Sequence, residues 1–252
     1  MPEFVLGCEI CEDLWVPQPP SARLAEAGAT VLVNLSASSE LVGKAGYRRQ
    51  LIAGQSARLA CGYLYADAGL GESTQDLVFS GHDLICENGT VLAESERFTT
   101  GLICSELDLG RLSHERRRMN TFRQSNGAMT EVWFDLPLHE VNLTRYFAQK
   151  PFVPANQEEL SDRCAEILHM QASGLATRLR HTRAKAAVLG LSGGLDSTLA
   201  LIVTVHAFDL LGWEHSGIHT VTMPCFGTTQ RTKSNAEQLA EAYGTTLPVS
   251  YT

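Results

Sequence analysis

Residues 186–197 read AAVLGLSGGLDS, and this stretch decides the fold of the C-terminal part of the chain. Residues 186–191 form a short apolar run, which predicts a strand. An apolar run over 197–211 then predicts a helix. Between them, Gly193 and Gly194 allow positive φ and let the backbone approach a ligand closely. The stretch therefore predicts a strand, a tight turn and a helix, in that order.

The turn has the chemistry of an anion site. Freed backbone N–H groups and a helix N-terminus point to one place, which suits linked phosphates. The hydroxyls of Ser192 and Ser197 can add hydrogen bonds. The Asp196 carboxylate would repel phosphate unless it caps the helix or holds Mg²⁺. The site would lie at the carboxyl ends of parallel strands, where open α/β sheets bind ligands.

Other interpretations of the turn remain open. No Gly-Lys-Ser/Thr follows, so it is not a Walker A loop. Residues 190–194 match the Gly-x-Ser-x-Gly elbow of α/β-hydrolases, with Ser192 as nucleophile. That enzyme would need a downstream acid and then a histidine, whereas no histidine follows His219. A plain glycine-rich turn without function is the third interpretation.

The elements around the turn indicate a parallel sheet. A long helix is expected to begin at Asn156, which forms a capping-box pattern with Glu159. A strand is expected over 218–223, and a second capping box, Ser234 with Glu237, predicts a helix that ends at Gly244. Strand and helix alternate at a spacing typical of βαβ units.

The first half of the chain mixes strands and helices around a core that we expect to be covered on both sides. Ser21 is a candidate helix cap, and Asn88-Gly89 suits the type I′ turn of a hairpin. The polar segment 113–126, with its three arginines 116–118, predicts a solvated face. The expected strands are 5–10, 30–35, 62–66, 83–86, 91–93 and 101–107, and the expected helices are 21–27 and 47–60.

Cys11 stands where the first expected strand gives way to a proline-rich turn. A thiol at that place can project into a cleft and attack an amide as a nucleophile. It can equally be a small buried core residue. With Cys8 it forms a single C-x-x-C, but a structural zinc site would need a second pair, and a redox pair would normally begin a helix.

Composition narrows the class of protein. The chain has 252 residues, of which 44% are hydrophobic, and a net charge of −8, so it can bury a core but does not suit nucleic acid. No apolar run is long enough for a membrane span, and the start lacks a basic signal sequence, so we expect a cytoplasmic protein. The seven cysteines are expected to be free. Four lie in apolar runs and are expected to be buried: Cys8, Cys61, Cys86 and Cys104.

The glycine turn resembles a known family. Residues 192–197 resemble the pyrophosphate loop of the N-type ATP pyrophosphatases, and residues 223–229 resemble a strand and loop of NAD synthetases among them. The resemblance implies that ATP and Mg²⁺ are cofactors, with Asp196 as the metal ligand and Met223 near the adenine. The residues that it places against ATP are Gly190, Leu191, Ser192, Gly193, Gly194, Leu195, Asp196, Ser197 and Met223.

The first half resembles a nitrilase-type amidase, chiefly at residues 10–13, 34–38, 76–94 and 97–98. The resemblance implies that Cys11 is a glutaminase nucleophile and that Trp15 and Ser38 line a glutamine pocket. This amidase fused to a pyrophosphate loop is similar to glutamine-dependent NAD synthetases. The implied fold is α/β: the C-terminal part of a nitrilase-like αββα sandwich, then the start of a Rossmann-like parallel sheet. The implied boundaries are 1–135 for the amidase, 136–155 for a linker and 156–252 for the ATP-binding domain.

The resemblance implies a homo-oligomeric enzyme that acts on glutamine, deamido-NAD and ATP, without nucleic-acid or membrane partners. Both ends look cut, because residues 4–10 already form a core strand and 247–251 begin another. The family supplies a catalytic glutamate and lysine before the cysteine, and only ten residues precede Cys11. We therefore expect a fragment that is nearly inactive by itself. A module that binds an adenine nucleotide without catalysis is a further alternative.

Overall fold

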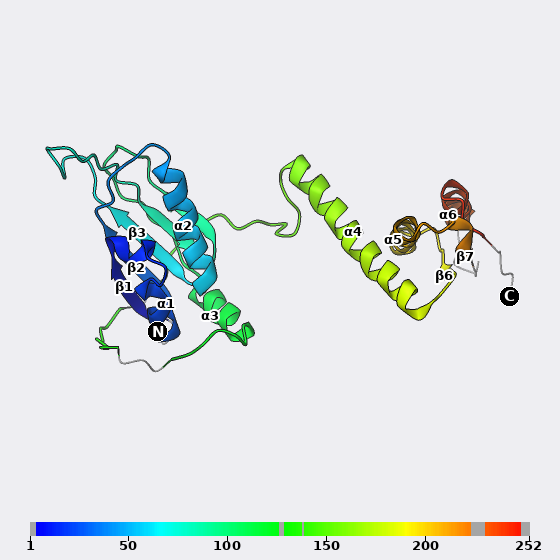
Figure 1. Cartoon of the computed structure of the whole chain (residues 1–252), viewed down its shortest axis with the longest axis horizontal. Coiled ribbons are helices and arrows are strands. Elements are labelled where there is room, and N and C mark those ends of the chain that lie inside the picture. Colours follow the sequence, from blue (N-terminus) through cyan, green and yellow to red (C-terminus); the bar gives the residue numbers. More distant parts are fainter. Residues whose placement is uncertain (1–3, 126–128, 138, 223–229, 248–252) are drawn as a thin grey trace. The chain divides into compact units, whose positions relative to one another are not determined.

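The computed structural model describes residues 4–125, 129–137, 139–222 and 230–247. The chain divides into two compact units, Met1–Phe147 and Ala148–Thr252, which Figure 1 draws in blue to green and in green to red. The division falls inside the segment 136–155. The mixed α/β class expected from the sequence is confirmed in both units.

A five-stranded sheet forms the first unit, with the strands in the order β1-β2-β3-β4-β5. The first three strands are parallel, and β3, β4 and β5 pair antiparallel. The carboxyl ends of β1, β2 and β3 therefore meet at one side of the sheet. The strands are β1 (Leu6–Ile10), β2 (Val31–Ser36), β3 (Gly62–Asp67), β4 (Leu84–Glu87) and β5 (Thr90–Glu94).

The hairpin of β4 and β5 confirms the expected turn. Asn88 has a φ of 45° and Gly89 a φ of 88°, as a type I′ turn requires. The strand expected over 101–107 is wrong, because these described residues form neither strand nor helix. Leu107 packs closely against Gly62, and the backbone N–H of Asp108 donates to Glu87 at 2.6 Å. Side-chain contacts thus hold this segment in place of a strand ladder.

Helices cover one face of this sheet: α1 (Pro20–Glu26) and α2 (Lys44–Leu59), with the short η1 (Cys11–Trp15) between β1 and α1. They share one core with the sheet, in which Leu14, Ile52 and Tyr63 are buried. The expected cap at Ser21 is wrong, since α1 begins at Pro20, whose fixed φ suits a first helical turn. Ser21 is instead buried inside the helix.

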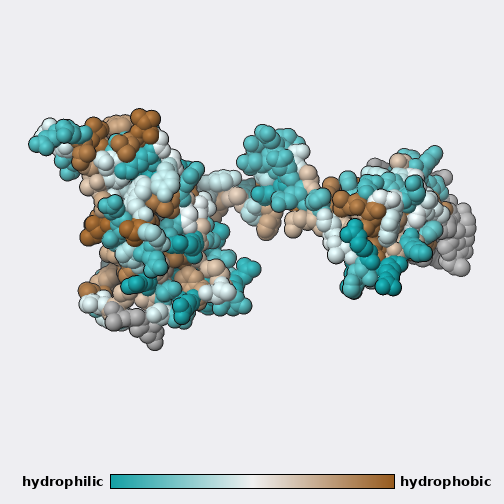
Figure 2. All heavy atoms as spheres, viewed as in Figure 1, coloured by the Kyte–Doolittle hydropathy of each residue, from teal (hydrophilic) through white to brown (hydrophobic). Residues whose placement is uncertain are grey.

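The face of the sheet opposite the helices is buried at Val31 and Ile85 but open toward the ends of β1 and β2 among the described residues, so the core expected to be covered on both sides is covered there only in part. Ile10 is 66% exposed and Leu35 is 65% exposed. Leu6 and Cys8, on the same face of β1, are exposed as well. Figure 2 shows such hydrophobic residues, in brown, on the surface of the first unit. Cys61 and Cys86 are buried as expected, whereas Cys8 and Cys104 are not.

The arginines of 116–118 lie at the end of α3 (Leu109–Arg118). Arg117 and Arg118 are exposed, as expected for a solvated face. Arg116 departs from that expectation, because its Nε donates to the carbonyl oxygens of Leu59 and Ala60, each at 3.1 Å. Its guanidinium also lies 5.0 Å from the ring centre of Phe122. Arg116 therefore ties α3 to the end of α2.

The second unit is built on a βαβ element. Strands β6 (Ala187–Gly190) and β7 (Ile218–Val221) are parallel, and α5 (Leu195–Leu211) connects them, so the expected parallel sheet is confirmed. A further parallel bridge joins His219 to Thr246. Gly212 ends α5 with a φ of 66°. The short η2 (His215–Gly217) precedes β7.

Two more helices belong to the described part of this unit. Helix α4 (Gln157–Thr182) begins after Asn156, whose side chain accepts from the N–H of Glu158 at 2.9 Å. Small side chains at Ala172, Ala176 and Ala207 let α4 and α5 pack closely. Helix α6 (Gln230–Ala242) begins four residues before Ser234, so the cap expected there is wrong. No helix among the described residues has both the length and the apolar character needed to cross a membrane.

Candidate functional site

Cys11 directly follows β1 and has a φ of 51°, a left-handed conformation that is uncommon for residues with a Cβ. It is the first residue of η1, whose start is fixed by the Asp13 carboxylate, which accepts from the N–H of Ile10 at 2.9 Å. Its side chain is neither fully buried nor fully exposed. A thiol at a sharp bend after a strand is accessible to a small substrate.

Two side chains of the neighbouring strand β2 contact Cys11. The Asn34 amide accepts from the Cys11 N–H at 2.9 Å and donates to the Cys11 carbonyl oxygen at 3.2 Å. The Ser36 hydroxyl donates to the Cys11 sulfur at 3.5 Å. Tyr65 in turn donates to Ser36 at 2.6 Å. The thiol therefore has hydrogen-bond support from the core side.

A buried polar chain lies behind these contacts. Tyr63 accepts from Asn34 at 3.4 Å and donates to the carboxylate of Glu9. Burial raises the pKa of the Tyr63 phenol well above its ordinary value, and the hydrogen bond to Glu9 raises it further. The phenol therefore keeps its proton. Glu9 also accepts from the N–H of Ser21 at 2.7 Å.

Trp15 and Ser38, the residues expected to line a glutamine pocket, lie on segments next to Cys11 in the fold. Trp15 ends η1, and the Lys44 ammonium lies 5.3 Å from its ring centre. Tyr47 packs against the same indole, with 5.4 Å between ring centroids. Lys44 was missed from the sequence, although it follows Gly43 at the start of a helix, close to the carboxyl end of β2.

Ser38 is buried, and a charged cluster holds it. Its N–H donates to Asp67 at 2.8 Å, and its hydroxyl accepts from Arg48 at 3.4 Å. Arg48 is 0% exposed and also donates to Glu40 at 3.1 Å and to His82 Nδ1 at 3.0 Å. This cluster was not predicted, because it joins residues far apart in the sequence.

Two carboxylates of this cluster differ in their protonation behaviour. Burial raises the pKa of the Asp67 carboxyl, against the opposing effects of the Ser38 N–H and of Arg48. Burial also acts to raise the pKa of Glu40, but hydrogen bonds from Ser80 and Arg48 outweigh it and leave that pKa below its usual value. Of the two carboxylates, Glu40 therefore keeps its negative charge to lower pH as a partner of Arg48.

The turn between β6 and α5 is the second candidate region. Gly193 has a φ of 77°, but Gly194 is extended, with a φ of −89°, and is the N-cap of α5. Only one of the two glycines thus uses the positive-φ region. The first N–H groups of α5 have no acceptor within the helix, as in any helix N-terminus.

The serines of the turn hydrogen-bond to each other. Ser192 Oγ lies 3.0 Å from Ser197 Oγ, and the N–H of Ser192 donates to Ser197 at 3.2 Å. Ser192 Oγ also accepts from the N–H of Gly194 at 3.3 Å, and Ser197 donates to the Gly194 carbonyl oxygen at 3.1 Å. These hydrogen bonds give the turn a defined shape.

The other predicted nucleotide contacts are placed differently from one another. Leu191 is buried in the core, and its N–H donates to the Val221 carbonyl oxygen at 2.9 Å, so its side chain faces away from solvent. Leu195 is 85% exposed. Gly190 has open space where a Cβ would be. Met223 lies outside the described residues.

Asp196 lies in the first turn of α5 and is exposed. The capping role considered for it is wrong, because the N-cap is Gly194. Its carboxylate oxygens are of the type that Mg²⁺ prefers. Among the residues that the structure describes, no group of three or more His, Cys, Asp or Glu side chains could hold a metal ion.

The α/β-hydrolase alternative finds no support in this unit. His215 contacts Asp209 through Nε2 at 2.7 Å, and its Nδ1 lies 3.0 Å from the Tyr243 carbonyl oxygen. Both ring nitrogens are thus engaged. Asp209 lies near the end of α5, roughly 20 Å along the helix axis from Leu195 at its start, and Ser192 comes before that start. This pair cannot activate Ser192.

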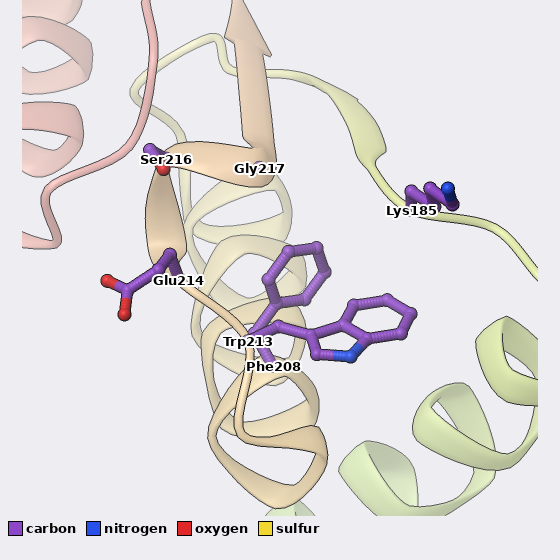
Figure 3. A pocket seen from close by; sticks show the side chains of 6 residues that line it. All are labelled: Lys185, Phe208, Trp213, Glu214, Ser216 and Gly217. Atoms are coloured by element: carbon purple, nitrogen blue, oxygen red, sulfur yellow. The ribbon is translucent and has the colours of Figure 1, made fainter.

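A hollow of about 480 Å³ lies at the opposite ends of β6 and β7 from the glycine turn. Figure 3 shows the rings of Phe208 and Trp213 in it, 5.3 Å apart and at 89° to each other. Lys185 and Gly217 come just before the two strands. The hollow is therefore separate from the candidate nucleotide site.

Comparisons with known proteins agree on one family. Residues 167–250 match the NAD synthase family model. A glutamine-dependent NAD(+) synthetase from Mycobacterium bovis is 47% identical over 258 residues, covering 98% of this chain and 38% of that protein. A glutamine-dependent NAD(+) synthetase from Thermotoga maritima is 28% identical, and the match covers 95% of this chain and 40% of that protein. A human glutamine-dependent NAD(+) synthetase is 28% identical, and the match covers 76% of this chain and 27% of that protein.

Solved structures give weaker likenesses. A glutamine-dependent NAD+ synthetase from Acinetobacter baumannii in complex with adenosine diphosphate has a TM-score of 0.38 at 22% identity, covering 97% of this chain and 38% of that one. Nit3 from Saccharomyces cerevisiae, of the nitrilase superfamily, has a TM-score of 0.41 at 19% identity, covering 47% and 43%. These scores add nothing to the topology described above. The chain spans 38% of the length of its curated Mycobacterium bovis relative. Because the sequence identity extends over 98% of the chain, the chain is a homologue of the glutamine-dependent NAD(+) synthetases.

Proposed function

We propose that the chain contributes two catalytic regions to glutamine-dependent NAD synthesis. In this proposal residues 1–135 are the amidase part, 136–155 the linker and 156–252 the ATP-binding part. The observation that supports it most is the 47% identity to a glutamine-dependent NAD(+) synthetase along 98% of the chain. A cytoplasmic location and assembly into a homo-oligomer belong to the same proposal.

In the amidase part, Cys11 is the nucleophile. Its sulfur attacks the carboxamide carbon of glutamine, ammonia leaves, and water then hydrolyses the γ-glutamyl thioester to glutamate. Trp15 and Ser38 line the pocket for glutamine. The hydrogen bond from Ser36 to the sulfur supports this role, because it places a hydroxyl donor beside the attacking atom.

In the ATP-binding part, the turn 190–197 holds the phosphates of ATP. Backbone N–H groups of the turn and the start of α5 face the anion, and Met223 lies near the adenine. The deamido-NAD carboxylate attacks the α-phosphorus, and pyrophosphate leaves. Ammonia then displaces AMP from the adenylate and gives NAD. Asp196 would hold Mg²⁺, which supplies charge neutralisation at the phosphates.

Two measurements test the proposal. A glutamine analogue with a diazoketone in place of the carboxamide is expected to add to Cys11 and to leave the exposed Cys8 unmodified, as mass spectrometry of peptides would detect. Titration with Mg-ATP is expected to shift the amide NMR signals of Gly193 and Gly194. Labelling of both cysteines alike, or glycine signals that do not move, would contradict the respective half.

A further inference from the structure

We propose that Asn34 is the positioning residue of the Cys11 thiol, an inference that rests on the proposed role of Cys11 as nucleophile. The side chain of Asn34 is 0% exposed and binds both backbone polar groups of Cys11. None of its contacts involves the sulfur itself. Asn34 therefore acts on the thiol through the main chain.

The strand register explains why a side chain is needed at this place. β1 pairs with β2 as far as Ile10 opposite Leu35, and Asn34 pairs with Glu9. Cys11 comes after the last pair, so the strand ladder no longer fixes it. Asn34 replaces the missing ladder partner and holds Cys11 at its φ of 51°. Without these bonds, a residue with a Cβ favours negative φ, which would turn the sulfur away.

The surroundings of Asn34 fix which way its amide faces. The protonated phenol of Tyr63 donates to Glu9, so its oxygen is left to accept from the Asn34 NH₂ group. The same NH₂ group donates to the Cys11 carbonyl oxygen. The amide oxygen is then left to face the Cys11 N–H. An aspartate has the same shape but no donor, so it would place an acceptor against the Cys11 carbonyl.

The test compares alkylation rates by iodoacetamide in the full 252-residue chain, with Cys8 as an internal reference. Asn34→Asp and Asn34→Ala are expected to lower the ratio of the Cys11 rate to the Cys8 rate at least tenfold. Ser56→Ala is the matched control, because Ser56 is also a buried polar residue of this unit but contacts Ala53 and Gly89. It should leave the ratio unchanged. An unchanged ratio in folded Asn34→Asp would overturn the proposal.

A second measurement separates positioning from a purely structural role. Glycine adopts positive φ freely, so in a Cys11→Gly background Asn34→Ala should lower the denaturation midpoint by less than it does in the wild type. An equal drop in both backgrounds would refute positioning.

Tyr63→Phe serves if the Asn34 variants do not fold. It keeps the ring and removes the hydroxyl that orients the amide, so it should lower the alkylation ratio by a smaller factor, and no change in that ratio would count against the proposal. Failure of the proposed function is visible separately, as wild-type Cys8 and Cys11 that the glutamine analogue labels alike.

Discussion

The hydroxyl of Ser36 lies 3.5 Å from the sulfur of Cys11 and donates to it. Tyr65 donates to the same hydroxyl at 2.6 Å, which leaves the Ser36 proton directed at the sulfur. The contact joins the end of β1 to the end of β2. It places a neutral donor beside the group that we propose as nucleophile, and so it leads to the first prediction.

Ser36→Ala should slow alkylation of Cys11 by about tenfold, because a hydrogen bond to a charged group contributes roughly 1.5–3 kcal/mol. The rate is measured by peptide mass spectrometry at pH 8. Ser95→Ala, which removes a hydroxyl bonded to Asp83 and Gly81 in the same unit, should leave the rate unchanged. Equal rates in Ser36→Ala and the wild type would rule out a role for this contact.

Arg48→Met should destabilise the first unit strongly. The substitution leaves the side chain of Asp67, which is 0% exposed, without its cationic partner, and leaves Glu40, which is 8% exposed, with the partly exposed Arg97 at 3.5 Å in place of the buried Arg48. Breaking a buried ion pair in this way costs about 3–5 kcal/mol. Chemical denaturation followed by circular dichroism measures the loss.

The neighbouring Arg49 offers the matched control for this experiment. It pairs with Glu94 at 2.9 Å, but its side chain is 51% exposed, so Arg49→Met should cost at most about 1 kcal/mol. Equal losses in the two variants would contradict the importance of the buried cluster.

Gly193→Ala should weaken binding of Mg-ATP by more than tenfold. A methyl group at a φ of 77° strains the turn by about 1 kcal/mol or more and changes the direction of its N–H groups. Isothermal titration calorimetry measures the affinity.

Gly212→Ala controls for the strain alone. Gly212 also has positive φ, 66°, but ends α5 instead of starting it. The variant should lose similar stability and keep its ATP affinity. If both variants lost affinity alike, the effect would be one of folding and not of the turn.

His215 should make the second unit less stable at alkaline pH. The hydrogen bond to Asp209 raises the pKa of His215 above its ordinary value, and the Tyr243 carbonyl adds to this effect. The stabilisation is therefore complete below the unfolded pKa of about 6.5 and is lost as the pH rises through the higher folded value.

Denaturation midpoints at pH 6 and pH 8.5 measure this effect, with Asp209→Asn as comparison. The denaturation midpoint of the wild type should exceed that of the variant by more at pH 6 than at pH 8.5. A difference that does not change with pH would refute the linkage.

Local patterns predicted the parts of the fold that local forces determine. The strand, turn and helix around Gly193, the hairpin at Asn88 and the start of α4 after Asn156 depend on residues close in sequence, and the structure has all three. The segment 101–107 is apolar enough for a strand, but it forms none, and its Leu107 packs on Gly62 instead.

The main residues of the candidate sites could be predicted from the sequence, but the residues that contact and position them could not. Cys11 could be singled out because it follows an apolar strand, yet its positive φ depends on Asn34, which reaches it only through the register of β1 and β2. Lys44 over Trp15 is likewise a contact that no spacing in the sequence reveals. The conformation of Gly194 also differed, because one positive-φ residue suffices to turn the chain into α5.

The position of β1 has a practical consequence for handling the protein. Among the described residues β1 pairs only with β2, so it is an edge strand of the sheet. Its unpaired edge exposes free backbone N–H and C=O groups beside the exposed Leu6 and Ile10. Such unpaired edge strands favour strand addition between copies and aggregation. Because Cys11 directly follows β1, self-association there would shield the thiol, and dilute samples are the right starting point for any measurement of its reactivity.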